Sequence, residues 1–349
     1  MSADAKSKFA GLLRFLLRLG IAGGLIFWLC YHHREEFQQA FPRIKPAFFA
    51  LALAVYAAAT AVGARRWQVI LQLAGFPVRF GEAMELTMKG CFFALVIPGG
   101  AIGGDVAKLG FLAARTAQGA RLEGALTILL DRIVGMAGLF LAALLLIVAE
   151  LPIFLRVEIP GITLTPAGRI AIVLLPAAVC LAGLLSIPIL LFLSRLRQIG
   201  WIDRSLAAAD RISRGAVSRL TQVFELARRQ WRTLLFWAVL SLFFVHGAQA
   251  AVVLCICAGL GLTLTVPVVM AVGAAVMIGN MAGLLPLSFS GLGVRDMVIC
   301  LLLSAARLPD PAAVPLLYSV VLVLFNLAGG LFLLNGVGQT NSITRKHTL

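Results

Sequence analysis

The sequence has few charged residues, and the two signs are unequally represented. Only 13% of the 349 residues are Asp, Glu, Lys or Arg, and 30 basic residues outnumber 15 acidic ones. No hydrophilic stretch is long enough to form a separate soluble domain. Enzyme motifs are also missing, since the chain has no H-E-x-x-H, no G-x-S-x-G and no glycine-rich loop ending in G-K-[ST]. We therefore expect a protein that is not an enzyme.

Cysteine and histidine are scarce as well. All six cysteines lie in apolar segments, and Cys255 and Cys257 form a C-x-C too close together for a disulfide framework or a zinc site. Of the four histidines, only His246 lies within an apolar run. These patterns predict no metal site and no cofactor.

Apolar residues dominate what is present. They make up 61% of the chain, whereas soluble domains contain about 45–50%. A helix needs about 20 apolar residues to cross a bilayer. Runs of that length lie near 10–30, 46–73, 121–149, 167–193, 232–260 and 311–335. We predict an all-α polytopic membrane protein with about six full spans, forming a single integral membrane domain over residues 1–349. The first run lacks a cleavage site and is expected to be a retained helix.

Two further apolar stretches, 82–115 and 265–307, are interrupted by helix-breaking residues. The pieces on either side of each interruption are too short to span a bilayer. We therefore predict two re-entrant broken-helix pairs. The residues expected to break the helices are Pro98, Gly99, Gly100, Gly103 and Gly104 in the first stretch and Gly291 and Gly293 in the second.

The basic residues predict the orientation. A net charge of +15 would indicate nucleic acid in a soluble protein, but in a membrane protein Lys and Arg collect in cytoplasmic loops. With both termini in the cytoplasm and each interrupted stretch returning to its own side, 22 basic residues lie inside and six outside. Arg132 and Arg295 remain within the membrane. We expect a multi-pass protein of the cell (inner) membrane that does not bind nucleic acid.

The same topology predicts an inverted repeat, with halves at about 46–150 and 232–335. Each half contains a span, a re-entrant pair and a second span, in opposite orientations. "DVAKLGFLAAR" from Asp105 resembles "DMVICLLLSAAR" from Asp296. Inverted repeats with broken helices that meet near the bilayer midplane are typical of transporters.

The segment 194–231 joins the two halves. Apolar residues recur there at helical spacing, and nine arginines through Arg232 oppose three acids. Such a basic amphipathic segment is expected to lie on the cytoplasmic leaflet. It is either a simple connector or a surface that recruits anionic headgroups.

The first break carries Asp105 and Lys108. We predict that the helix restarts with Asp105 as its N-cap, and helix N-termini favour anions. Asp105 then either caps its own helix or, with Lys108, forms a site for a lipid headgroup or a coupling proton.

The second break carries Arg295 and Asp296. The forked guanidinium suits phosphate better than an ammonium does, so Arg295 is a candidate contact for a lipid phosphate. The alternative is an internal ion pair of Arg295 with Asp105 or Asp296.

Asp131 and Arg132 are further candidates for substrate binding, about ten residues into the third span. Adjacent side chains point in different directions on a helix, so each needs another partner. By contrast, Arg65, Arg66 and Trp67 lie near the end of a span and are interpreted as interface anchors. Mid-membrane polar groups are expected to hydrogen-bond between helices; they are His246, Asn280 and Asn326.

The order and spacing of four motifs resemble those of the lysylphosphatidylglycerol synthase transmembrane family, also called uncharacterised protein family 0104. The motifs are Arg65-Arg66-Trp67, the break from Pro98 to Asp105, Asp131-Arg132 and the break "GLGVRD" that ends at Asp296. The resemblance covers residues 10–335. We expect no aminoacyltransferase domain after the membrane part, so the resemblance implies the translocase half of such proteins.

The resemblance implies a flippase-like lipid transport function. The substrate would be a phospholipid, an aminoacyl-lipid, a hopanoid or a polyprenyl-linked lipid that moves between leaflets. Expected partners are membrane lipids with anionic headgroups and a lipid-modifying enzyme. The alternatives are a non-catalytic accessory or scaffold for a lipid or glycan synthase and, as a third class, a membrane-embedded transferase.

Overall fold

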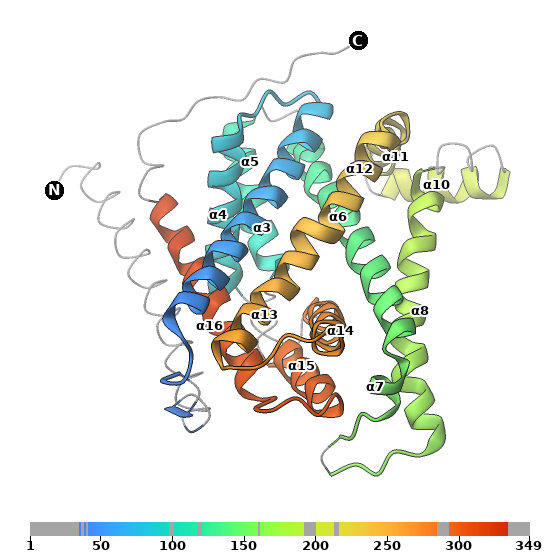
Figure 1. The fold of residues 1–349 in the computed structure, drawn as a ribbon. Helices are drawn as coiled ribbons and strands as arrows, with labels where there is room; N and C mark the ends of the chain where they lie inside the picture. Colours follow the sequence, from blue (N-terminus) through green and yellow to red (C-terminus); the bar gives the residue numbers. More distant parts are fainter. Residues whose placement is uncertain are drawn as a thin grey trace.

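The computed structural model describes residues 35, 38–39, 41–97, 101–116, 121–159, 161–191, 200–212, 216–284 and 293–333. The regular elements among these residues are helices, and no β-strand occurs within them. Figure 1 shows an elongated bundle in which several long helices run from one end to the other. The predicted all-α membrane fold is confirmed.

Five helices of the described residues are long and apolar enough to cross a membrane. Their lengths of 21 to 29 residues exceed the roughly 20 that a span requires. They coincide with five of the six expected spans, and the expected span at 10–30 lies outside the described residues. They are α3 (Pro46–Leu73), α6 (Arg121–Ala149), α8 (Pro166–Leu191), the continuous α12–η2–α13 (Trp231–Ser241, Leu242–Gly247, Ala248–Gly259) and α16 with η4 (Ala313–Ala328, Gly329–Leu333).

Two pairs of shorter helices occupy the interrupted stretches. The first pair is α4 (Phe80–Val96) with α5 (Ala101–Arg115), and the second is α14 (Val266–Ala282) with α15 (Val294–Ala305). The members of each pair pack against each other. The pairs lie toward opposite ends of the bundle, and α14 is seen almost along its axis in Figure 1. Two helix pairs therefore occupy the stretches predicted to be broken, while the inverted repeat of the two halves stays a prediction.

The glycines of the first pair have a different role from the one predicted. Gly103 and Gly104 lie inside α5, which begins at Ala101, so the helix does not restart at Asp105. A Cβ on Gly104 would lie 2.5 Å from the carbonyl oxygen of Gly90 on α4. Glycine therefore lets the two backbones approach closely, as small residues do between membrane helices. The prediction of Asp105 as an N-cap is wrong, because the helix already has a complete first turn before it.

The remaining predicted break residues divide into two groups. Pro98, Gly99, Gly100 and Gly291 lie outside the described residues. Gly293 directly precedes α15 and has a φ of +95°. That backbone conformation favours glycine, because side chains with a Cβ rarely adopt it. Gly293 therefore ends the second break as expected.

Two amphipathic helices follow α8, namely α10 (Gly200–Ile212) and α11 (Ala216–Arg229). In Figure 1, α10 runs across the bundle axis rather than along it, at the end where α4 and α5 also lie. We call this the α10–α11 end. A short helix, α7 (Leu151–Leu155), lies at the opposite end before α8.

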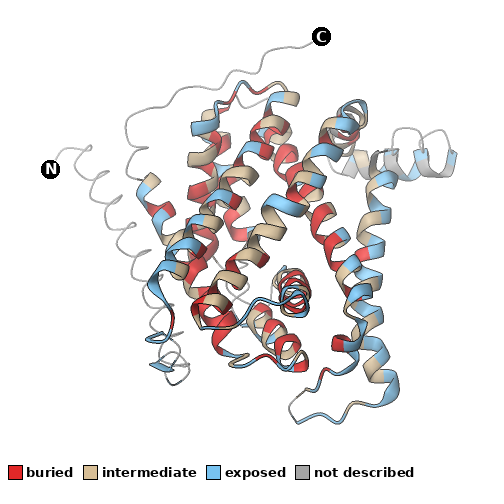
Figure 2. Cartoon of the chain, in the orientation of Figure 1, coloured by how far each residue is buried: buried red, intermediate tan, exposed pale blue. Residues whose placement is uncertain are grey.

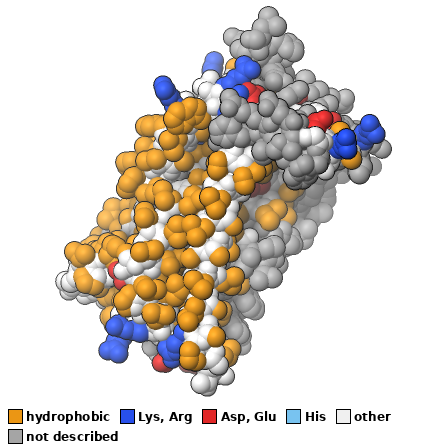
Figure 3. All heavy atoms as spheres, turned by 90° about the vertical axis from the view of Figure 1, so that its right-hand side faces the viewer, with side chains coloured by type: hydrophobic (Ala, Val, Ile, Leu, Met, Phe, Trp, Pro, Cys, Tyr) orange, Lys and Arg blue, Asp and Glu red, His pale blue; other side chains and the backbone are white. Residues whose placement is uncertain are grey.

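Burial shows how the helices are arranged around the centre. Figure 2 shows buried residues concentrated on α4, α14 and α15 and on the inward sides of the spans that surround them. In contrast, α8 exposes apolar side chains such as Leu174, Leu175 and Leu185. Figure 3 shows such side chains covering the middle of the α8 face, with Lys and Arg toward its ends. An apolar surface of this extent suits contact with lipid.

Candidate functional site

A polar cavity of about 300 Å³ lies where the two helix pairs meet the long spans. Its walls come from α3, α4, α5, α6, η2, α13, α14, α15 and α16. Both predicted halves of the molecule therefore contribute to one chamber. The charged side chains that line it are Asp105, Lys108, Arg132 and Arg295.

Asp105 on α5 pairs with Arg132 on α6. The guanidinium donates from Nε at 2.6 Å and from Nη2 at 2.7 Å to the two carboxylate oxygens. The Arg132 side chain remains 43% exposed, and it lines the cavity. One edge of this guanidinium is thus held by a carboxylate, while the side chain also lines the chamber.

Arg295 on α15 is held by its neighbour and by α16. It donates to the Asp296 carboxylate from Nε at 2.9 Å and from Nη2 at 2.8 Å, and Nη2 also contacts the Ser319 hydroxyl. Its guanidinium lies 4.7 Å from the Tyr318 ring centroid. Asp296 in turn accepts from Ser319 at 2.7 Å. The internal pair with Asp296 that the sequence left open is present, whereas Asp105 has Arg132 as its partner.

Lys108 is the least neutralised cation of the cavity. It is 7% exposed, and its Nζ lies 3.5 Å from the Trp67 ring centroid. Among the described residues, no carboxylate lies within ion-pairing distance of it. A cation over the face of tryptophan gains a favourable electrostatic interaction, but the positive charge is not cancelled.

Arg66 and Trp67 are not interface anchors. Arg66 is 8% exposed and Trp67 is fully buried, and the indole donates to the Thr127 hydroxyl at 3.3 Å. The prediction is wrong because this turn of α3 faces α6 and α5 rather than the bilayer surface. Only Arg65 of this motif is exposed.

The partner of Arg66 is Asp131. Its guanidinium donates to the carboxylate from Nε at 2.8 Å and from Nη2 at 3.2 Å, and to Ser241 of α12 at 2.8 Å. Gly135 makes room for this group, since a Cβ there would lie 2.9 Å from Nη1. Asp131 and Arg132 therefore do pair with different helices, as expected. Asp131 and Asp296 were also predicted to bind substrate, but they do not line the cavity. They form ion pairs with Arg66 and Arg295 instead.

Uncharged polar groups complete the chamber. His246 lies in η2, a π-helical turn of a kind often found at functional sites, and its Nε2 lies 2.9 Å from the Gly135 carbonyl oxygen. Asn280 donates to Gln249 at 3.0 Å. The predicted interhelical bonds of His246 and Asn280 are confirmed. The Asn326 side-chain oxygen, in contrast, is buried with no partner among the described residues.

Several contributing residues were missed by the sequence analysis. Thr87, Cys91 and Gln249 line the cavity. Ser241 accepts a hydrogen bond from Arg66, and Ser319 accepts one from Arg295. The spacing of His246 and Gln249, three residues apart in an apolar run, was a signal for one polar helix face. Single serines and threonines in apolar helices carry no comparable signal, because they often bond to their own backbone.

The comparison with known proteins agrees with this architecture. Residues 15–330 match the family described as the lysylphosphatidylglycerol synthase TM region. The chain belongs to that family. A curated relative is the UPF0104 membrane protein PH1989 of Pyrococcus horikoshii, which is 24% identical over 294 residues, covering 82% of this chain and 86% of the relative. No solved structure matches the chain.

Membership in this family and the five spans establish a multi-pass membrane protein. The family is named after the membrane region of a lipid-synthesising protein, which suggests a lipid-related role in the membrane. The cavity adds a chemical property to that role. Three cationic side chains and one carboxylate line it, and both arginines have carboxylate partners, which leaves Lys108 as the cation without one among the described residues.

Proposed function

We propose that this protein is a lipid translocase that moves a phosphate-bearing lipid between leaflets. The headgroup would pass through the polar cavity while the acyl chains stay in the bilayer. The lipid leaves chemically unchanged, so the protein acts as a transporter and not as an enzyme. The lipids that fit are phospholipids, aminoacyl-phospholipids and polyprenyl phosphates.

The observation that carries this proposal is the buried Lys108. Its ammonium lines the cavity with no carboxylate partner among the described residues, next to two arginines that already have partners. An unpaired charge at bilayer depth costs about 2.5–3.5 kcal/mol even on the lenient insertion scale. A lipid phosphate in the cavity would offset that cost. Ionisable groups within the membrane mark substrate pathways in many transporters.

The unpaired Asn326 oxygen and the Thr87 hydroxyl support the same view. Both belong to residues that line the cavity, and both atoms are buried with no partner among the described residues. Buried polar atoms are normally hydrogen-bonded. A headgroup with donors and acceptors, or water that accompanies it, would satisfy them.

Reconstitution tests the proposal directly. The purified chain is placed in vesicles that contain a trace of acyl-labelled fluorescent phosphatidylglycerol, phosphatidylethanolamine or aminoacylated phosphatidylglycerol. Dithionite then removes the fluorescence of the outer leaflet, and the protected fraction reports movement. We expect movement of at least one of these lipids, slowed at least tenfold by Lys108→Met. Arg156→Gln, which changes an exposed arginine outside the cavity, is the matched control.

The native Cys91 gives a second measurement, because it lines the cavity. With Cys30, Cys180, Cys255, Cys257 and Cys300 replaced by alanine, a small thiol reagent should modify Cys91 more slowly when the transported lipid is present. Mass spectrometry should recover that lipid unaltered. A chain that moves none of the three lipids and leaves Cys91 unprotected contradicts the proposal and favours the accessory role.

A further inference from the structure

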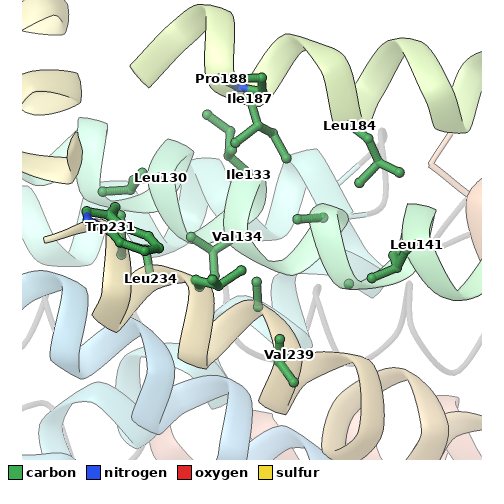
Figure 4. A pocket seen from close by; sticks show the side chains of 14 residues that line it. Leu130, Ile133, Val134, Leu141, Leu184, Ile187, Pro188, Trp231, Leu234 and Val239 are labelled. Atoms are coloured by element: carbon green, nitrogen blue, oxygen red, sulfur yellow. The ribbon is translucent and has the colours of Figure 1, made fainter. Parts of the chain in front are cut away.

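A second groove, apolar throughout, lies on the other side of α6 from the polar cavity. Arg132 and Leu139 of α6 face the cavity. The α6 residues that line the groove are Leu130, Ile133, Val134, Ala137, Gly138 and Leu141. Its other walls are α8 and α12. Figure 4 shows Trp231 beside Leu130 at one end and Leu141 at the other.

The shape of the groove limits what it can hold. From Leu130 to Leu141 the rise along α6 is about 16 Å at about 1.5 Å per residue. The cavity volume over that length is about 290 Å³. A helix with its side chains is about 10–12 Å across, and a volume of about 290 Å³ over this length is too small to enclose one. A single hydrocarbon chain fits the space better, and its lining offers that chain only apolar contacts along α6.

Arginines precede and follow Trp231, which lines one end of the groove. Trp231 is the first residue of α12, and the Arg232 guanidinium carbon lies 5.6 Å from its ring centroid. Arg229, whose side chain is 73% exposed, ends α11 nearby. Arg228 and Arg229 share one carboxylate, that of Glu225. Three arginines against one acid leave positive charge next to an apolar groove, and tryptophan is a residue enriched at the headgroup level of membranes.

We propose that this groove is a binding site for one anionic phospholipid, separate from the polar cavity. One acyl chain lies along α6 between α8 and α12, and the phosphate contacts Arg229 and Arg232. Guanidinium groups near a bilayer surface attract anionic headgroups, and their fork matches phosphate oxygens. The site requires no translocation, so it stands apart from the proposed transport function.

Quenching of Trp231 fluorescence by brominated lipid tests the site in the full chain. Trp28, Trp201 and Trp237 are replaced by phenylalanine, and the fully buried Trp67 is kept as an unquenched background. The chain is reconstituted into phosphatidylcholine with increasing amounts of phosphatidylglycerol, and either lipid carries dibrominated chains. The measured quantity is the binding constant of phosphatidylglycerol relative to phosphatidylcholine at Trp231.

We expect this relative constant to be well above one, and to fall roughly fivefold for each of Arg229→Gln and Arg232→Gln. Ala137→Phe, which fills the groove without changing charge, should lower it toward one. Leu145→Phe adds bulk on an exposed position of α6 outside the groove and should leave it unchanged. Arg156→Gln at the opposite end is the charge control.

Three results would overturn the proposal. A relative constant near one means that the site has no preference for anionic lipid. Sensitivity to the arginines but not to Ala137→Phe means that surface charge alone attracts the lipid. Protection of Trp231 from both brominated lipids means that a protein segment covers the groove. Lipid translocation is measured on the same variants. If the protein moves no lipid, the quenching result is unchanged, so failure of the proposed transport and failure of this site can be told apart.

Discussion

Arg132 of α6 and Asp105 of α5 form a two-bond ion pair, with N–O distances of 2.6 and 2.7 Å. Arg295, which lines the same cavity from the other half of the chain, is paired with Asp296 instead. The cavity thus contains two arginines that are each held by a separate carboxylate. This arrangement leaves Lys108 as the cation without such a partner among the described residues.

The first prediction concerns these pairs. Asp105→Asn and Arg132→Gln should each destabilise the protein, and the double variant should lose less than the sum of the two. Contacting charged groups typically show coupling free energies of about 0.5–3 kcal/mol. Asp105→Asn combined with Arg295→Gln should be close to additive, because the two residues have different partners. Thermal unfolding in detergent measures these four variants and Arg295→Gln alone, and strong coupling of Asp105 with Arg295 would contradict the assigned pairs.

The second prediction concerns the buried pair of Arg66 with Asp131. Removing one partner of a buried ion pair leaves an uncompensated charge and costs about 3–5 kcal/mol. Arg66→Met should therefore lower the unfolding temperature strongly, whereas Arg65→Met, at the exposed neighbouring position, should change it little. Equal effects of the two substitutions would show that Arg66 is not held as described.

The third prediction concerns the close contact of α4 with α5. Gly104→Ala places a Cβ 2.5 Å from the Gly90 carbonyl oxygen, so the helices must separate. Overpacking of this kind costs about 1–3 kcal/mol. Gly110→Ala on the same helix meets nothing within 4 Å and should be neutral or stabilising by up to about 1 kcal/mol. Gly104→Ala should therefore unfold at a lower temperature than Gly110→Ala, and its yield of purified protein should also be lower.

The fourth prediction concerns orientation. In a background without native cysteines, Arg211→Cys on α10 should react with an impermeant thiol reagent only from the cytoplasmic side. Arg156→Cys at the opposite end should react only from outside. Both positions are exposed, and the distribution of basic residues predicts that α10 lies on the cytoplasmic side. Labelling of Arg211→Cys from outside would reverse the predicted topology.

The sequence alone determined five of the six expected helical spans and the two pairs of shorter helices. Both follow from lengths, since a bilayer requires about 20 apolar residues and glycine and proline interrupt a helix. α3 and α6 coincide with the predicted runs 46–73 and 121–149. The need of Asp131 and Arg132 for different partners also followed from helical geometry, because adjacent residues face different directions.

The tertiary structure decided which partners those residues have and what the glycines do. Arg66 lies near the end of a span, where sequence patterns predict an anchor, yet packing of α3 against α6 turns it inward to Asp131. Gly104 looks like a helix breaker, but its role depends on the backbone of α4 lying against it. Both properties arise from contacts between segments far apart in the chain, and no local pattern records which helix faces will meet.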